Sequence, residues 1–127
     1  MNQITNPAPL ARYEMAAGAA IQHGNLAALN AEGKAVPAAD AAGLTVIGVA
    51  DKIVENEVEV ASGIFAFANA GSNPVTRLDR GKACFVKDAL TVDSTGGTGK
   101  VPAGIVVDVY DGEVYVDVTP AALAAAK

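Results

Sequence analysis

The feature of this sequence that most constrains its fold is a strand pattern that occurs twice. Residues 48–60 read Gly-Val-Ala, a polar break and Glu-Val-Glu-Val, and residues 104–116 read Gly-Ile-Val, a polar break and Glu-Val-Tyr-Val. The two readings lie 56 residues apart throughout, and upstream His23-Gly24 corresponds to Arg80-Gly81 at a separation of 57. Because a short β-module cannot bury its apolar face alone, two copies predict one small barrel or sandwich.

The composition favours self-association. At 127 residues the chain has the length of one domain. Its apolar residues are mostly alanine and valine, and only 5% of its residues are aromatic. Such small side chains contribute little each, since burial is worth about 0.8 kcal/mol per methylene. We therefore expect a homo-oligomer, which buries more apolar surface than a lone barrel.

The charge pattern argues against nucleic acid and membranes as partners. The net charge is -5, and basic residues are scattered except for a local excess at 77–87 that Asp79 and Asp88 dilute. A nucleic-acid footprint needs a basic stripe, which is absent from the sequence. The chain also lacks a run of about 18 apolar residues that would span a bilayer and an opening basic-then-apolar leader. One cysteine, Cys84, excludes an internal disulfide and favours a reducing compartment.

The predicted fold class is mainly β: a small β-barrel or β-sandwich built from two similar strand modules, with an extended N-terminal arm and a short C-terminal tail. Pro7 and Pro9 block helix formation in the arm. For residues 13–21 we prefer a strand over a short helix. The predicted organisation is an arm at 1–13, a β domain at 14–119 with repeats at approximately 19–62 and 76–119, and a tail at 120–127.

Motifs for catalysis or cofactor binding are weak. The glycine-rich stretch 93–100 lacks the first glycine of a phosphate loop, and Val101 stands where that motif needs Ser or Thr, so a flexible hairpin loop is expected. His23 is the only histidine, which disfavours both a metal site and a catalytic triad. Cys84 lies in an apolar strand and is expected to be buried and inert. Asp108 and Asp117 could face each other across the last hairpin, as part of a solvated face.

A succession of glycine-anchored strings between about residues 16 and 119 carries a family resemblance. The strings are GKAVPAAD at 33–40, IGVAD at 47–51, SGIFAFAN at 62–69, FVKD at 85–88 with TV at 91–92, and AGIVVDV at 103–109. They resemble the capsid decoration (cement) and related head structural proteins of tailed phages and prophages.

That resemblance implies a small β-rich protein that binds the outer face of an expanded capsid, commonly as a trimer, where major capsid subunits meet. The expected partners are then the major capsid protein and further copies of this chain in a homotrimer. From the residues we expect no enzymatic activity, cofactor or metal, and the resemblance agrees with this expectation. It also implies synthesis in the host cytoplasm and a final place on the capsid surface of the virion.

The terminal segments lie outside the resemblance, and capsid contact by either is a separate hypothesis. Ile4, Leu10 and Tyr13 are the large apolar side chains of the arm beyond Met1, so we expect them to contact the shell. The alternative function is another virion-surface structural or adhesive β-module that holds glycans or a host surface. A small hydrolase is a third possibility, which the lack of a nucleophile motif disfavours.

Overall fold

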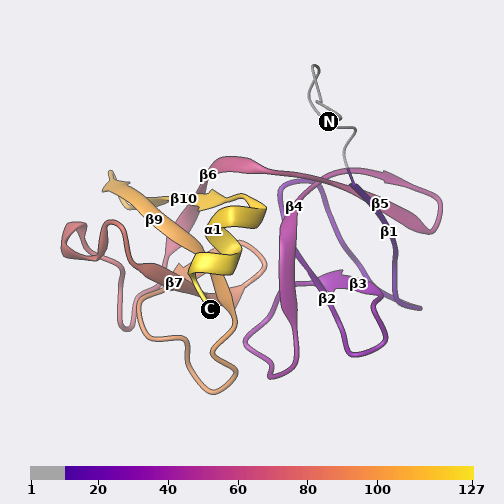
Figure 1. Ribbon diagram of the computed structural model, residues 1–127, viewed down its shortest axis with the longest axis horizontal. Coiled ribbons are helices and arrows are strands. Elements are labelled where there is room, and N and C mark those ends of the chain that lie inside the picture. Colours follow the sequence, from indigo (N-terminus) through magenta and orange to yellow (C-terminus); the bar gives the residue numbers. More distant parts are fainter. Residues whose placement is uncertain (1–10) are drawn as a thin grey trace, which may run out of the picture.

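The computed structural model describes residues 11–127, so Ile4, Leu10 and the arm at 1–10 lie outside the described residues. The described part is built of strands with one short 3-10 turn and one short helix (Figure 1). The elements are β1 (Ala11–Glu14), β2 (Leu26–Leu29), β3 (Ala35–Pro37), β4 (Thr45–Val54), β5 (Glu57–Ala61), β6 (Gly63–Asn69), η1 (Arg77–Asp79), β7 (Ala83–Asp88), β8 (Thr91–Asp93), β9 (Pro102–Tyr110), β10 (Glu113–Val118) and α1 (Pro120–Ala125).

The strands form two sheets, which confirms the predicted mainly β fold. One sheet has five strands in the order β1-β5-β4-β2-β3, and the other is a closed barrel in the order β10-β6-β8-β7-β9. In Figure 1 the two sheets lie side by side, with α1 in front of the barrel. No helix in the described range 11–127 has the length and apolar character needed to cross a bilayer.

The two sheets are two copies of one topology. Replacing each strand of the first sheet by the strand five places later turns β1-β5-β4-β2-β3 into β6-β10-β9-β7-β8, which is the order around the barrel. The copies differ in closure: β6 and β8 pair in parallel, whereas the first sheet closes only through a parallel bridge between Met15 and Ala35. The duplicated pattern in the sequence therefore corresponds to a duplicated fold.

The repeated glycines mark equivalent close approaches of the backbone. Gly48 in β4 and Gly104 in β9 have φ values of 153° and 150°, which disfavour any residue with a side chain. A Cβ at Gly48 would lie 2.8 Å from the carbonyl oxygen of Ala61, and one at Gly104 would lie 2.3 Å from that of Asp117. Both long strands shift register beside these glycines, so a bulge is part of each module.

The apolar core is shared between the two modules. One cluster fills the barrel and extends into the first sheet through Leu26, Val46 and Val49, and it includes Leu123 of α1. A second, smaller cluster lies within the first sheet and contains Met15 and Ile21. The C-terminal segment, expected to fray or dock, therefore docks as α1, with Thr119 accepting a hydrogen bond from the Ala122 amide at its N-terminus.

The N-terminal boundary differs from the prediction. Residues 11–13 were expected in the arm, but they belong to β1, where Ala11 pairs with Val60 and Tyr13 with Val58. The expected strand at 13–21 is wrong beyond its first residues, because β1 ends at Glu14 and a turn follows. Backbone pairing with β5, which lies far along the chain, fixes this strand, and local residue preferences do not reveal it.

Candidate functional site

The residues considered for catalysis do not assemble into a reactive centre. His23 is exposed, and its Nδ1 lies 2.8 Å from the carbonyl oxygen of Asp51, which requires the proton on Nδ1. Ser94 Oγ donates to the carbonyl oxygen of Asn73 at 2.9 Å. Between residues 11 and 127, no group of three or more His, Cys, Asp or Glu side chains is arranged to hold a metal ion.

Cys84 is buried in β7, as predicted. Burial raises the pKa of the Cys84 thiol from its ordinary 9.0 to about 12, and the carboxylates of Asp93 and Asp79 add to this increase. A thiol with so high a pKa carries almost no thiolate at neutral pH, and the thiolate is the nucleophilic form. Cys84 is therefore a core side chain.

The glycine-rich loop at 94–100 already uses the amide groups that would bind an anion. The amides of Thr98 and Gly99 donate to the carboxylate of Asp40, at 3.3 Å and 2.6 Å, and the amide of Gly96 donates to Asp93 at 2.8 Å. Asp40 precedes β4 in the first module, so the loop fastens the two modules together. The expected hairpin is wrong, because the loop joins β8 to β9 and these two strands do not pair with each other. The flexibility of the loop stays a prediction.

The last hairpin does not pair Asp108 with Asp117. A bulge shifts the register of β9 against β10, so that Asp108 lies opposite Tyr115 and Asp117 lies opposite Ile105. Asp108 instead meets two guanidinium groups, with Arg77 Nε at 3.5 Å and Arg80 at 3.9 Å. One carboxylate oxygen of Asp117 is buried without a hydrogen-bond partner.

Equivalent strands of the two modules present different outer faces. In the first module Arg12 of β1 lies opposite Glu59 of β5 and forms an ion pair with it at 2.7 Å. The position of Glu59 corresponds to Tyr115 in β10, which lies opposite the exposed Ala66 of β6. On the outer surface of β6, β10 and β9, Ile64 (60% exposed) lies opposite Asp117, and Tyr110 (62% exposed) lies opposite Glu113. The partly exposed Val107 falls in the bulge of β9. We call this β6–β10–β9 surface the apolar face.

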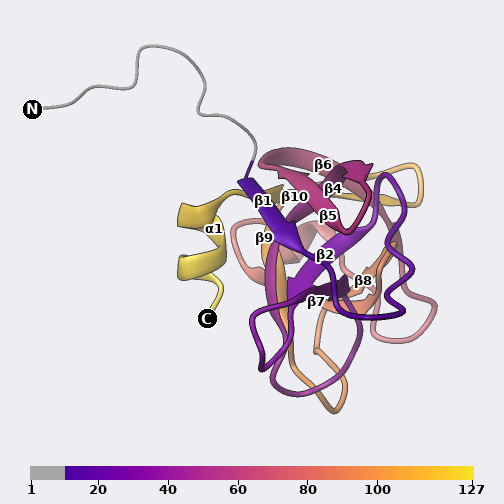
Figure 2. The same cartoon turned by 90° about the vertical axis from the view of Figure 1, so that its right-hand side faces the viewer.

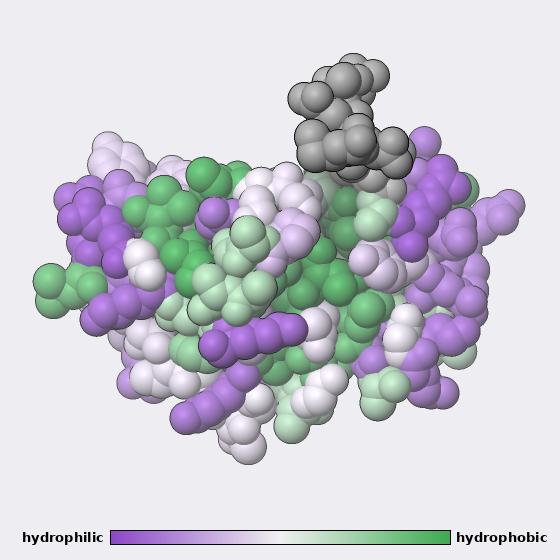
Figure 3. All heavy atoms as spheres, in the orientation of Figure 1, coloured by the Kyte–Doolittle hydropathy of each residue, from purple (hydrophilic) through white to green (hydrophobic). Residues whose placement is uncertain are grey.

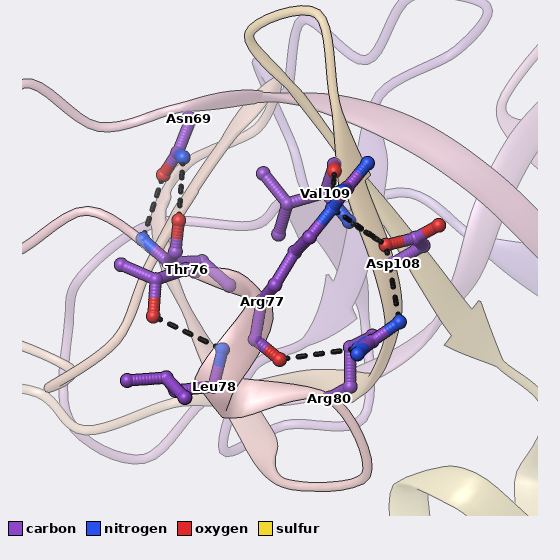
Figure 4. A network of polar contacts seen from close by, with 8 residues as sticks. Asn69, Thr76, Arg77, Leu78, Arg80, Asp108 and Val109 are labelled. Carbon is purple, nitrogen blue, oxygen red and sulfur yellow. Dashed lines mark hydrogen bonds and ion pairs between the residues drawn. The ribbon is translucent and has the colours of Figure 1, made fainter.

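The 3-10 turn beside the apolar face is held by many polar contacts. Thr76 and Asp79 form a reciprocal capping box around η1, and the Asn69 side chain both donates to and accepts from the backbone of Val75 at 2.8 Å. Arg77 Nε donates to the carbonyl oxygen of Val109 in β9 at 3.0 Å. Figure 4 shows this network, with the side chain of Leu78 pointing away from it.

A groove runs between α1 and the first module. Tyr13, the one predicted contact residue within the described range, lines it from β1 and also packs on the second core cluster. Figure 2 shows α1 beside β1, and Figure 3 shows an apolar area over β4 next to α1. The groove has a volume of about 240 Å³ and is lined by Tyr13, Thr45, Val46, Ile47, Pro120, Leu123, Ala124 and Lys127.

Sequence reasoning missed the η1 turn, although a signal for it was present. Thr76 followed by Asp79 matches the capping-box spacing that marks the start of a helical turn. The partner Asp108 could not be foreseen, because the bulge in β9 decides which way its side chain points.

No protein-family model, no curated protein and no solved structure matches this chain. The fold and surface define it as a small duplicated β-protein, whose first module has a charged outer face and whose second module has exposed apolar side chains between carboxylates.

Proposed function

We propose that this protein is a decoration protein of a phage head, which binds the outer surface of the expanded capsid and stabilises it without catalysing a reaction. The resemblance noted in the sequence supports this proposal. The short sequence strings that carry it contain residues that shape the fold. The string at 33–40 ends at Asp40, whose carboxylate holds the other module. The strings at 47–51 and 103–109 contain the two bulge glycines, Gly48 and Gly104.

The observation that carries the proposal is the contrast between the outer faces of the two modules. At equivalent strand positions the first module has charged side chains that pair with one another, as Arg12 does with Glu59. The second module has Tyr115 and Ala66 at those positions, with Ile64 beside them. Since the same topology tolerates a charged face, the fold does not require an apolar one. An exposed apolar patch is typical of a surface that binds another protein.

Stabilisation would follow from bridging. A rigid body bound across the junction of major capsid subunits resists their separation, and many identical sites on one shell multiply the effect. The proposed assembly is a homotrimer on the virion surface, formed from protein made in the host cytoplasm. The shared core and the Asp40 contact keep the two modules in one orientation, as bridging requires. Ile4 and Leu10 remain predicted shell contacts of the segment before β1.

Binding to purified expanded heads that lack decoration tests the proposal. Co-sedimentation should show saturable binding of the wild-type protein to expanded heads, and bound heads should release DNA at a higher temperature. Ile64→Lys should weaken binding at least tenfold, because it places a charge on the apolar face. The variant should remain folded, since Ile64 lies opposite Asp117 and the new ammonium faces a carboxylate.

Val54→Lys provides the matched control. Val54 is also partly exposed and lies opposite a carboxylate, Glu57, but it belongs to the first module. We expect this variant to bind heads as the wild type does. Failure of the wild-type protein to bind expanded heads would refute the proposed function, and equal binding by both lysine variants would refute the assignment of the apolar face.

A further inference from the structure

Leu78 is far more exposed than its surroundings require. Its side chain is 86% exposed, more than any other large hydrophobic residue between positions 11 and 127. The turn that carries it is fixed by the Thr76 and Asp79 capping box and by the hydrogen bond from Arg77 to β9. Figure 4 shows the leucine projecting from this braced turn. Because the backbone of the turn is already ordered, less conformational freedom is lost when Leu78 enters a partner's pocket.

The other module shows that this exposure is not imposed by the topology. The turns before β2 and β7 are equivalent, since Gly24 donates to the carbonyl of Ala50 and Gly81 donates to that of Val106, both at 2.8 Å. At the same separation of 57 residues, Leu78 corresponds to Ile21. Ile21 is only 7% exposed and belongs to the second core cluster. The second module therefore presents outward a side chain that the first module buries.

The charges around Leu78 indicate the chemistry of the partner. Arg77 and Arg80 share one carboxylate, that of Asp108, while Asp79 lies next to Leu78 in the turn and Lys82 follows Arg80 by two residues. These three cations and two carboxylates leave a net charge of +1 around Leu78. This region carries a local positive excess in a chain whose net charge is -5. An apolar side chain flanked by cations complements an apolar pocket whose rim carries carboxylates.

We propose that the turn at 76–80 is a plug whose Leu78 inserts into an apolar, carboxylate-rimmed pocket on a protein of the capsid shell. The proposal rests on the proposed function for the identity of the partner. The turn lies beside β9, the outer strand of the apolar face, so both can engage one continuous partner surface. The arginines add attraction that salt weakens, and Leu78 supplies the buried contact at the centre.

Binding of Leu78→Gln to undecorated expanded heads tests this proposal, with Leu90→Gln as the matched control. Leu90 is 54% exposed and lies in the turn between β7 and β8. Leu78→Gln should bind about 10- to 100-fold more weakly at an unchanged melting temperature, the loss expected for one buried leucine. Leu90→Gln should stay within twofold of wild type, and Leu78→Met should restore most of the affinity. Arg80→Gln should weaken binding and reduce its dependence on salt.

The outcomes separate this proposal from the proposed function. If wild-type protein binds heads and Leu78→Gln binds equally well, the plug is refuted while the decoration role stands. If wild-type protein does not bind heads at all, both are refuted. Binding of wild-type protein to vesicles of anionic phosphatidylglycerol, abolished by Leu78→Gln, would overturn the assignment of a protein pocket.

Discussion

Replacing Gly104 with alanine should be among the most destabilising single-methyl changes in this protein. The φ of 150° costs a residue with a side chain about 1–3 kcal/mol. The new Cβ would also lie 2.3 Å from the carbonyl oxygen of Asp117 and 2.8 Å from Val116 Cγ1. The first of these is backbone, so the contact is relieved only by separating β9 from β10, and overpacking of this kind adds about 1–3 kcal/mol. We expect a total of about 3–5 kcal/mol.

Gly112→Ala provides the comparison, because Gly112 also has a positive φ, 79°, but a Cβ there would meet nothing within 4 Å. Its cost should be about 1–2 kcal/mol, from backbone strain alone. Gly48→Ala, with its closest contact at 2.8 Å, should lie between the two. Urea denaturation followed by circular dichroism measures all three free energies of unfolding. A Gly104→Ala variant within 1 kcal/mol of Gly112→Ala would refute the reasoning from close backbone approach.

Two further predictions concern the core and the contact between the modules. Asp40→Ala should lower the free energy of unfolding by about 1.5–3 kcal/mol, because the Thr98 and Gly99 amides lose a charged acceptor. Hydrogen exchange at these two amides should accelerate in the variant. Unchanged exchange would contradict the contact. Burial raises the pKa of the Cys84 thiol from 9.0 to about 12 in the folded protein, so the unfolded thiol ionises first as the pH rises. The contribution of Cys84 to the free energy of unfolding is therefore fully present below pH 9 and is lost as the pH rises towards about 12. The pH dependence of unfolding should therefore be steeper for wild type than for Cys84→Ala over that range, and parallel curves would contradict it.

The duplicated strands could be predicted because their signals are local. The alternation of Glu and Val around Val58 and the glycine within each long strand are visible in the sequence, and they predict the observed strands and the close approach at each glycine. The bulges could not be placed to the residue, and each bulge changes which side chains lie opposite one another. Asp108 therefore meets Arg77 and Arg80 where the sequence suggested Asp117. Contacts between the modules, such as that of Asp40, join residues 58 and 59 positions apart. No periodic pattern in the sequence indicates contacts of this kind.

The candidate surface was less accessible to sequence reasoning than the fold. The sequence does not distinguish an exposed apolar residue from a buried one. Leu78 and Ile21 occupy equivalent positions, yet Leu78 is exposed and Ile21 is buried. The difference in exposure between the two side chains arises from how each turn packs against its own module. The contact residues predicted from the sequence were chosen by size alone, and Tyr13, the one that falls in the described range, belongs to β1.

Carrying both copies of the module in one chain frees the protein from a constraint that a pair of identical subunits would face. In a symmetric dimer, any substitution that gave one subunit an apolar outer surface would give the other subunit the same surface. Two such surfaces on one particle would favour uncontrolled polymerisation. Within a single polypeptide, the half that bears Arg12 and Glu59 can stay inert towards its neighbours while the half that bears Tyr115 specialises.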